Sequence, residues 1–142
     1  MGKKRIIKKA ETSAPVSSSA PAVSSKRRLS RGFVHVYSTY NNTIITLTDE
    51  NGNVYASNSS GRSGFSGSKK GTPYAATKAA ETLADQARDM GLTDVDVRIK
   101  GVGSGRESAL RVFAQRGFMI HSIKDVTPIP HGIPRPTKPR RV

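Results

Sequence analysis

The pattern of apolar and polar positions changes at residue 32. From there, "GFVHVYS" and "TIITLTD" alternate β-branched or aromatic residues with polar ones at nearly period two, which predicts two strands. Asn51-Gly52 separates the second run from "NVYAS", and both residues tolerate the positive φ angles of a short hairpin turn. Three strands in antiparallel succession are therefore expected.

A helix follows the third strand. Thr72-Pro73 supplies an N-cap residue and a proline suited to the first helical position, and Gly91 is a natural stop after Met90. The apolar positions repeat at helical spacing and predict the buried stripe of this helix: Ala76, Ala79, Leu83, Ala87 and Met90.

The remaining elements are a strand, a helix and a strand. "DVDVRIK" alternates valine and isoleucine with charged residues, which is typical of a strand with one buried face. A second helix is predicted over 105–116, closed by Gly117, and "FMIHSIKDV" is the last strand. The order βββαβαβ, with a right-handed parallel crossover at its end, predicts a single α/β domain over 32–131 with one mixed five-stranded sheet.

Charge is concentrated outside that domain. The chain of 142 residues carries a formal net charge of +14, of which +8 lies in 1–31, +4 in 132–142 and +2 in the interval between them. Residues 1–31 are basic and rich in Ser, Ala and Pro, so we expect a disordered extension, with an organellar transit peptide as the alternative. Residues 132–142 predict an extended, proline-rich basic tail. Two basic arms around a nearly balanced domain favour a polyanionic partner.

The composition argues against several classes of function. The chain contains no cysteine and three scattered histidines, so no metal site, cofactor site or thiol nucleophile is predicted. No apolar run reaches the roughly 18–20 residues that cross a bilayer, and no membrane partner is expected. Nothing in the pattern predicts a stable homo-oligomer.

The segment "GVGSGRESALR", 101–111, places three glycines before a predicted helix. Arg106 and Glu107 follow Gly105 where a Walker-type phosphate loop needs Lys-Ser/Thr, and the third glycine of a dinucleotide fingerprint is missing. Ser104 and Glu107 predict a capping box, which leaves Arg106 projecting near the positive helix end toward a phosphate or a base edge. A plain tight turn is the alternative interpretation.

A second segment, 57–71, also mixes glycine with cations before a helix, and adds Phe65 as a stacking or packing ring. The topology places the start of both helices at one edge of the sheet, so the two basic loops and the tails should converge on one polyanion. A metal-dependent nuclease using Asp94 and Asp96 is the alternative function. Those acids stand beside Arg98 and Lys100 on one strand face, which more often forms a solvated, paired surface, and no catalytic residue is predicted.

Four stretches identify a family. "YNNTIITLTDENGNV", "SGFSGSKKGTPYAA", "GVGSGRES" and "DVTPIPH…RPTKPRRV" resemble, in order and spacing, the S-eleven family of small-subunit ribosomal proteins in its bacterial form, over 32–142. The resemblance implies a ribonuclease-H-like fold without catalysis. It implies direct binding to small-subunit ribosomal RNA on the platform, near the messenger RNA exit path, in a cytoplasmic rather than an organellar ribosome.

The resemblance also implies partners and contact residues. The neighbouring proteins would be the S-six/S-eighteen pair and S-seven. The residues implied to contact RNA are polar or basic and lie in turns, loops and the C-terminal tail: Asn41, Asn42, Arg62, Ser66, Ser68, Lys69, Lys70, Arg106, Arg135, Lys138, Arg140 and Arg141.

Overall fold

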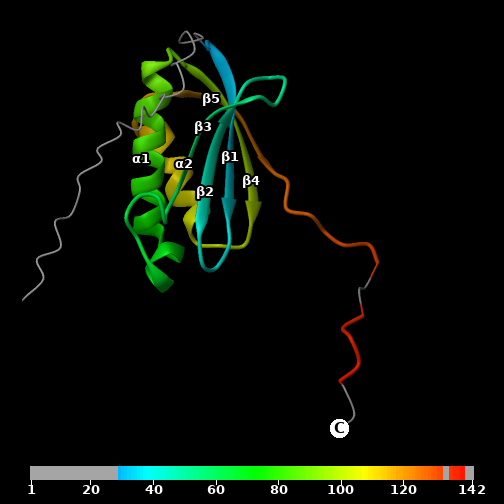
Figure 1. Ribbon diagram of the computed structural model, residues 1–142. Coiled ribbons are helices and arrows are strands. Elements are labelled where there is room, and N and C mark those ends of the chain that lie inside the picture. The colour runs from blue at the N-terminus through cyan, green and yellow to red at the C-terminus, as the bar shows by residue number, and fades with distance from the viewer. Residues whose placement is uncertain (1–28, 133–134, 140–142) are drawn as a thin grey trace, which may run out of the picture.

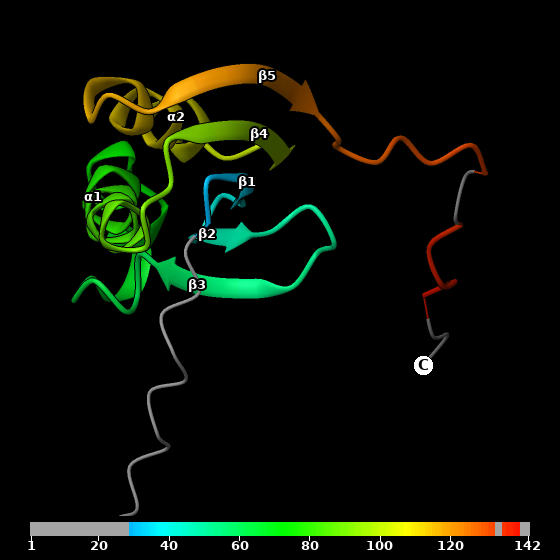
Figure 2. The same cartoon turned by 90° about the horizontal axis from the view of Figure 1, so that it is seen from above.

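The protein is a mixed five-stranded sheet with both helices on one of its faces (Figures 1 and 2). The computed structural model describes residues 29–132 and 135–139. Its elements, in chain order, are β1 (Arg31–Ser38), β2 (Thr43–Thr48), β3 (Val54–Ser59), the short 3-10 helix η1 (Gly67–Gly71), α1 (Pro73–Asp89), β4 (Asp94–Gly101), α2 (Gly105–Gln115) and β5 (Met119–Asp125). The α/β fold class predicted from the sequence is confirmed.

The strand order across the sheet is β3-β2-β1-β4-β5. β1 pairs with β2 in antiparallel fashion and with β4 in parallel fashion, so the first strand of the chain lies at the centre of the sheet. β2 and β3 are antiparallel, whereas β4 and β5 are parallel neighbours joined through α2. The C-terminal ends of β1, β3 and β4 therefore point the same way, toward the lower end of the molecule in Figure 1.

The β2–β3 hairpin exists, but its turn differs from the expected one. Three residues, Glu50 to Gly52, form the loop, since the Asp49 amide donates to the carbonyl of Asn53. Gly52 alone has a positive φ, at 88°, and the Asp49 carboxylate accepts hydrogen bonds from the amide and the side chain of Asn53. A type I turn closed by a left-handed glycine needs only one residue with positive φ, so Asn51 keeps an ordinary conformation.

Small side chains let α1 lie close to the sheet. Its buried face consists of six alanines and one leucine: Ala75, Ala76, Ala79, Ala80, Leu83, Ala84 and Ala87. This face is wider than the predicted stripe because α1 covers β2 and β3 on one side and contacts α2 on the other. Thr72 caps the helix by accepting from the Ala75 amide, and Gly91 follows its end with a φ of 83°, as the sequence predicted.

Phe113 of α2 fills the core over the half of the sheet that contains β1 and β4. Its ring is fully buried and lies 5.6 Å from the ring of Phe118, measured between centroids. Truncating a fully buried phenylalanine to alanine costs about 3–5 kcal/mol of folding free energy. Phe113 is thus the main anchor of α2 on β1 and β4.

The folded part begins slightly earlier than the expected boundary at residue 32. The Leu29 amide donates to the carbonyl of Met90, the Ser30 carbonyl accepts from the amides of Thr93 and Asp94, and β1 starts at Arg31. The expected disordered extension otherwise falls on 1–28, outside the described residues. Within the described ranges, no helix is long and apolar enough to cross a membrane.

Candidate nucleic-acid interface

Three chain segments meet at the lower end of the sheet in Figure 1: the turn between β1 and β2, the segment before α1, and the segment before α2. The backbone of Gly71 lies against that of Tyr40 so closely that a Cβ built on Gly71 would stand 2.0 Å from the Tyr40 carbonyl oxygen. Ser104 Oγ donates to the carbonyl of Gly71 at 3.1 Å. The two glycine-containing segments therefore converge, as the topology predicted. We call these segments, 39–42, 60–72 and 101–106, the loop surface.

Gly105 explains why the segment before α2 contains glycine. A Cβ at this position would stand 2.4 Å from Thr43 Oγ1 of β2 and 2.8 Å from the Cβ of Ala76 in α1. The space that the missing Cβ leaves at Gly105 is therefore filled by atoms of the protein itself. This packing lets α2 start directly against β2 and α1 and fixes the direction of its first turn.

The predicted capping box at Ser104 and Glu107 is wrong. Ser104 has helical backbone angles, with φ −69° and ψ −13°, and its side chain makes no capping hydrogen bond. Its hydroxyl is used for Gly71 instead, and Glu107 is exposed in the first helical turn. The Ser104 side chain thus contacts a distant segment at Gly71 rather than the start of its own helix.

Arg106 does not project freely into solvent. Its Nη1 lies 3.6 Å from Asp125 Oδ2 at the end of β5, and its side chain is 37% exposed. Asp125 is held in turn by Thr127, whose amide and hydroxyl donate to Oδ1 at 2.9 and 2.6 Å. These hydrogen bonds, followed by the charge of Arg106, lower the pKa of Asp125. An ion pair this long and this exposed is weak, so a phosphate can replace the carboxylate.

The cations of 60–72 are more available. Arg62 and Lys69 are exposed and Lys70 is half-buried, and none of the three forms an ion pair with another described residue. Lys69 and Lys70 lie in η1, where the sequence predicted an irregular loop. The Cδ of Lys70 lies 3.4 Å from a Cβ built on Gly61, so the Arg62 turn and η1 are neighbours. Ser66 and Ser68 are exposed beside them.

The β1–β2 turn contributes two different asparagines. Asn41 is exposed, whereas Asn42 Oδ1 is buried without a hydrogen-bond partner among the described residues. In the tail, Arg135 and Lys138 are exposed, and Arg140 and Arg141 lie outside the described residues. The predicted contact residues thus lie on the segments of the loop surface and, separately, on the tail, and Arg62 lines a hollow between β3 and α1 together with Thr82 and Gln86.

Two exposed tyrosines, one on the loop surface and one beside it, were missed in the sequence. Tyr40 is 78% exposed and Tyr74, at the start of α1, is 63% exposed. Phe65 packs edge-on against Tyr74, with 5.8 Å between ring centroids, and so supports that ring. A tyrosine in a turn between two predicted strands is the signal that could have indicated Tyr40.

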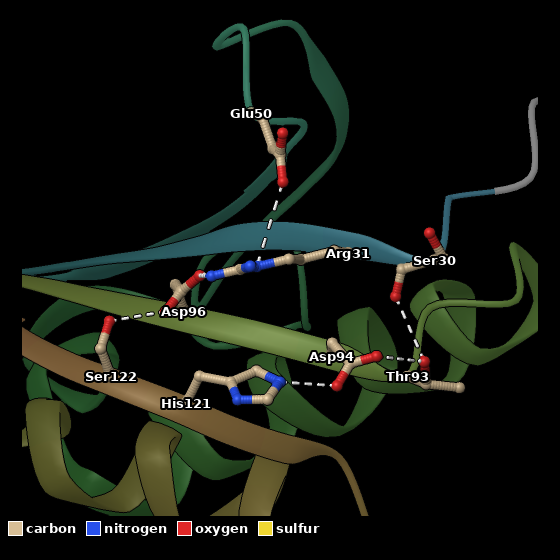
Figure 3. Close-up of polar contacts among 8 residues, drawn as sticks. All are labelled: Ser30, Arg31, Glu50, Thr93, Asp94, Asp96, His121 and Ser122. Atoms are coloured by element: carbon tan, nitrogen blue, oxygen red, sulfur yellow. Dashed lines mark hydrogen bonds and ion pairs between the residues drawn. The ribbon is translucent and has the colours of Figure 1, made fainter.

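Asp94 and Asp96 occupy the opposite end of the sheet and are bound to neighbouring side chains (Figure 3). Asp96 is only 5% exposed, and accepts from Arg31 Nη2 at 2.9 Å and from Ser122 Oγ at 2.6 Å. Asp94 lies 2.6 Å from His121 Nε2 and also accepts from Thr93. The hydrogen bonds from Ser122 and Arg31 lower the pKa of Asp96, and those from His121 and Thr93 lower the pKa of Asp94.

The sequence predicted that Asp94 and Asp96 form a solvated, paired surface beside Arg98 and Lys100. Asp96 is paired, but the prediction that it is solvated is wrong, because Asp96 is buried between Arg31 of β1 and Ser122 of β5. Within 29–132 and 135–139, no group of three or more His, Asp or Glu side chains is placed to hold a metal ion. Asp94 and Asp96 instead join β4 to the neighbouring strands β1 and β5.

Comparison with known proteins agrees with the resemblance seen in the sequence. The family model for ribosomal protein S11 matches residues 32–141. A relative from Solibacter usitatus (strain Ellin6076), named small ribosomal subunit protein uS11, is 48% identical over 141 residues, which cover 99% of this chain and 94% of the relative. The chain therefore belongs to the ribosomal protein S11 family and is a structural protein of the small ribosomal subunit, not an enzyme.

Proposed function

We propose that the loop surface binds small-subunit ribosomal RNA directly. The observation that carries the proposal is the junction of two helix starts through Ser104 and Gly71, which gathers Lys69, Lys70 and Arg106 at one end of the sheet. Backbone amides at a helix start favour an anion, and a cluster of cations beside them suits successive phosphates. The exposed ring of Tyr40 gives an unpaired base a surface on which to stack.

The bound RNA would be folded rather than a free nucleotide. The loop before α2 lacks the lysine and hydroxyl that hold a nucleoside triphosphate and its magnesium ion. Its rigid placement between β1, β2 and α1 instead offers a fixed spacing of charges to an RNA of fixed shape. We propose that this contact stabilises an RNA fold during subunit assembly.

Family membership supports a proposal for the place of the protein within the subunit. We propose a position on the platform near the messenger RNA exit path, beside the S-six/S-eighteen pair and S-seven, in a bacterial, cytoplasmic ribosome. The tail, with exposed Arg135 and Lys138, would reach RNA that the domain itself cannot touch.

Filter binding of transcribed small-subunit ribosomal RNA tests the proposal. Replacing Arg106 by alanine should weaken RNA binding by about 1–3 kcal/mol, as expected for a hydrogen-bonded cation contact. Because its ion pair is exposed, the free energy of unfolding should change far less. Arg111→Ala, on the exposed side of α2, is the matched control and should leave the affinity unchanged.

Two outcomes would contradict the proposal. One is equal RNA affinity for Arg106→Ala, Lys69→Gln/Lys70→Gln and the wild type. The other is saturable calorimetric binding of ATP or NAD that Arg106→Ala abolishes, since the loop would then be a nucleotide site.

A further inference from the structure

One face of the sheet has no helix on it (Figure 2). Both helices cover the face that carries Val34, Val36, Val95 and Val97, so the alternate residues of each strand point to the other side. We call that side, at its centre, the open face; its residues come from β1, β2, β4 and β5: Phe33, His35, Tyr37, Ile44, Thr46, Arg98, Lys100 and Lys124.

The open face carries positive charge that the protein does not neutralise. The register places Arg98 beside Lys124, and Lys100 two positions further along β4. Among the described residues, none of these three forms an ion pair, since the nearby acids are taken by other partners: Asp96 by Arg31 and Ser122, Asp94 by His121 (Figure 3). A phosphate approaching the face would meet these cations beside a carboxylate, Asp96, that Arg31 and Ser122 already hold.

Aromatic rings stand beside these cations. The guanidinium of Arg98 lies 4.2 Å from the centroid of the Phe33 ring, and Lys100 Nζ lies 5.7 Å from that of Tyr37. Tyr37 is 43% exposed at the central strand. A shallow groove of about 390 Å³ runs past Phe33, Arg98 and Lys124, and the paired residues Arg31 and Asp96 also line it. Rings and a flat guanidinium plane present surfaces on which unpaired bases can stack.

We propose that the open face binds a single-stranded segment of RNA. Arg98, Lys100 and Lys124 contact its phosphates, and Tyr37 stacks against a base. The inference rests on the proposed function, in which the protein is bound to ribosomal RNA, and adds a second surface to it. A duplex would hide its bases from Tyr37, so the matching partner is unpaired. The tail leaves β5 on the side away from the helices and runs outward from the domain (Figures 1 and 2).

Salt dependence measures the phosphate contacts. Binding of the full-length protein to transcribed small-subunit ribosomal RNA is followed from low to high salt for Lys100→Gln/Lys124→Gln. The log–log slope should fall in magnitude by about 1.4, at roughly 0.7 per single-strand phosphate contact. Arg88→Gln/Arg111→Gln removes the same charge from exposed helix positions, and should leave the slope unchanged.

Photochemical cross-linking measures the stacking. Irradiation of the wild-type complex should attach RNA to the peptide that contains Tyr37. Tyr37→Leu should remove this cross-link and weaken binding about five-fold or more, as loss of one stacked base does. Circular dichroism of each free variant verifies that the fold is kept.

The outcomes separate this inference from the proposed function. An unchanged slope for Lys100→Gln/Lys124→Gln together with no cross-link at Tyr37 overturns the open-face site, even if Arg106→Ala still weakens binding. Normal RNA binding combined with loss of a neighbouring protein from reconstituted subunits also overturns it, and assigns the face to a protein. If loop variants and open-face variants all bind normally, the proposed function falls as well.

Discussion

Ser104 Oγ, before α2, donates a hydrogen bond of 3.1 Å to the carbonyl of Gly71, before α1. These residues are 33 positions apart in the chain, yet the contact makes the two helix starts one unit. Gly71 is also pressed against the carbonyl of Tyr40. The geometry of the loop surface is therefore set jointly by three segments.

Gly71→Ala should disturb this unit. Its new Cβ would stand 2.0 Å from the Tyr40 carbonyl oxygen, and backbone must move to accommodate it. We expect a loss of at least about 1–3 kcal/mol in the free energy of unfolding, measured with urea, and weaker RNA binding. Gly61→Ala is the control, because its Cβ would meet side-chain atoms alone, Lys70 Cδ at 3.4 Å and Ser59 Oγ at 4.0 Å, which are ordinary contacts. Equal stability of the two variants would show that the Gly71 contact does not constrain the loops.

The elements could be predicted from the sequence because local signals determine them. The alternation of apolar and polar residues predicted β1, β2 and β4, and Thr72-Pro73 and Gly91 predicted the ends of α1. The details that failed depend on distant residues. Ser104 has the right sequence context for a capping box, but Gly71 lies within reach of its hydroxyl only after the sheet has formed.

The loop surface was partly predictable for the same reason. Topology alone brought the two helix starts together, whereas the ion pair of Arg106 with Asp125 depends on where β5 ends. Likewise, no local rule pairs Asp96 with Arg31, 65 residues away in the chain. The alternation in "GFVHVYS" and "DVDVRIK" showed that each strand has two different faces. The sequence did not predict that both helices cover the same face and leave the other one uncovered.

Asp125→Asn should strengthen RNA binding. The change removes the charge that holds Arg106 at 3.6 Å and frees the guanidinium for phosphate. Since exposed ion pairs are weak, we expect about a two- to five-fold gain in affinity in filter binding. Asp89→Asn, at the far end of α1, makes the same change in net charge and should have a smaller effect. A gain of equal size for Asp89→Asn would attribute the result to net charge alone.

Asp96 should make folding sensitive to acid. Its pKa in the folded protein is below the ordinary value of 3.8, owing first to Ser122 and then to Arg31. Its ionised form therefore stabilises the fold above about pH 3.8, and this contribution is lost as the pH falls through the lower folded pKa. Asp96→Asn should be less stable than the wild type at pH 6, with the difference narrowing toward pH 2 in urea unfolding. A constant difference across that range would contradict the prediction.

The C-terminal tail should act on RNA through charge and leave the fold intact. After Thr127, whose Oγ1 accepts from the Gly101 amide, residues 128–132 and 135–139 are exposed and contribute nothing to the core. Prolines limit the chain to extended conformations, so little further entropy is lost when it lies along RNA. Deleting 132–142 removes four cations and should reduce the log–log salt slope of RNA binding by about 3, at roughly 0.7–0.9 per contact.

A second variant separates the charge of the tail from its chain. Replacing Arg135, Lys138, Arg140 and Arg141 by glutamine keeps the length and the prolines, and should reproduce the slope of the deletion if phosphates are the partners. If the deletion weakens binding while the glutamine variant keeps the wild-type slope, the tail contacts a neighbouring protein instead. A lower melting temperature for the deletion without RNA would show that the tail packs on the domain, against its exposure in the structure.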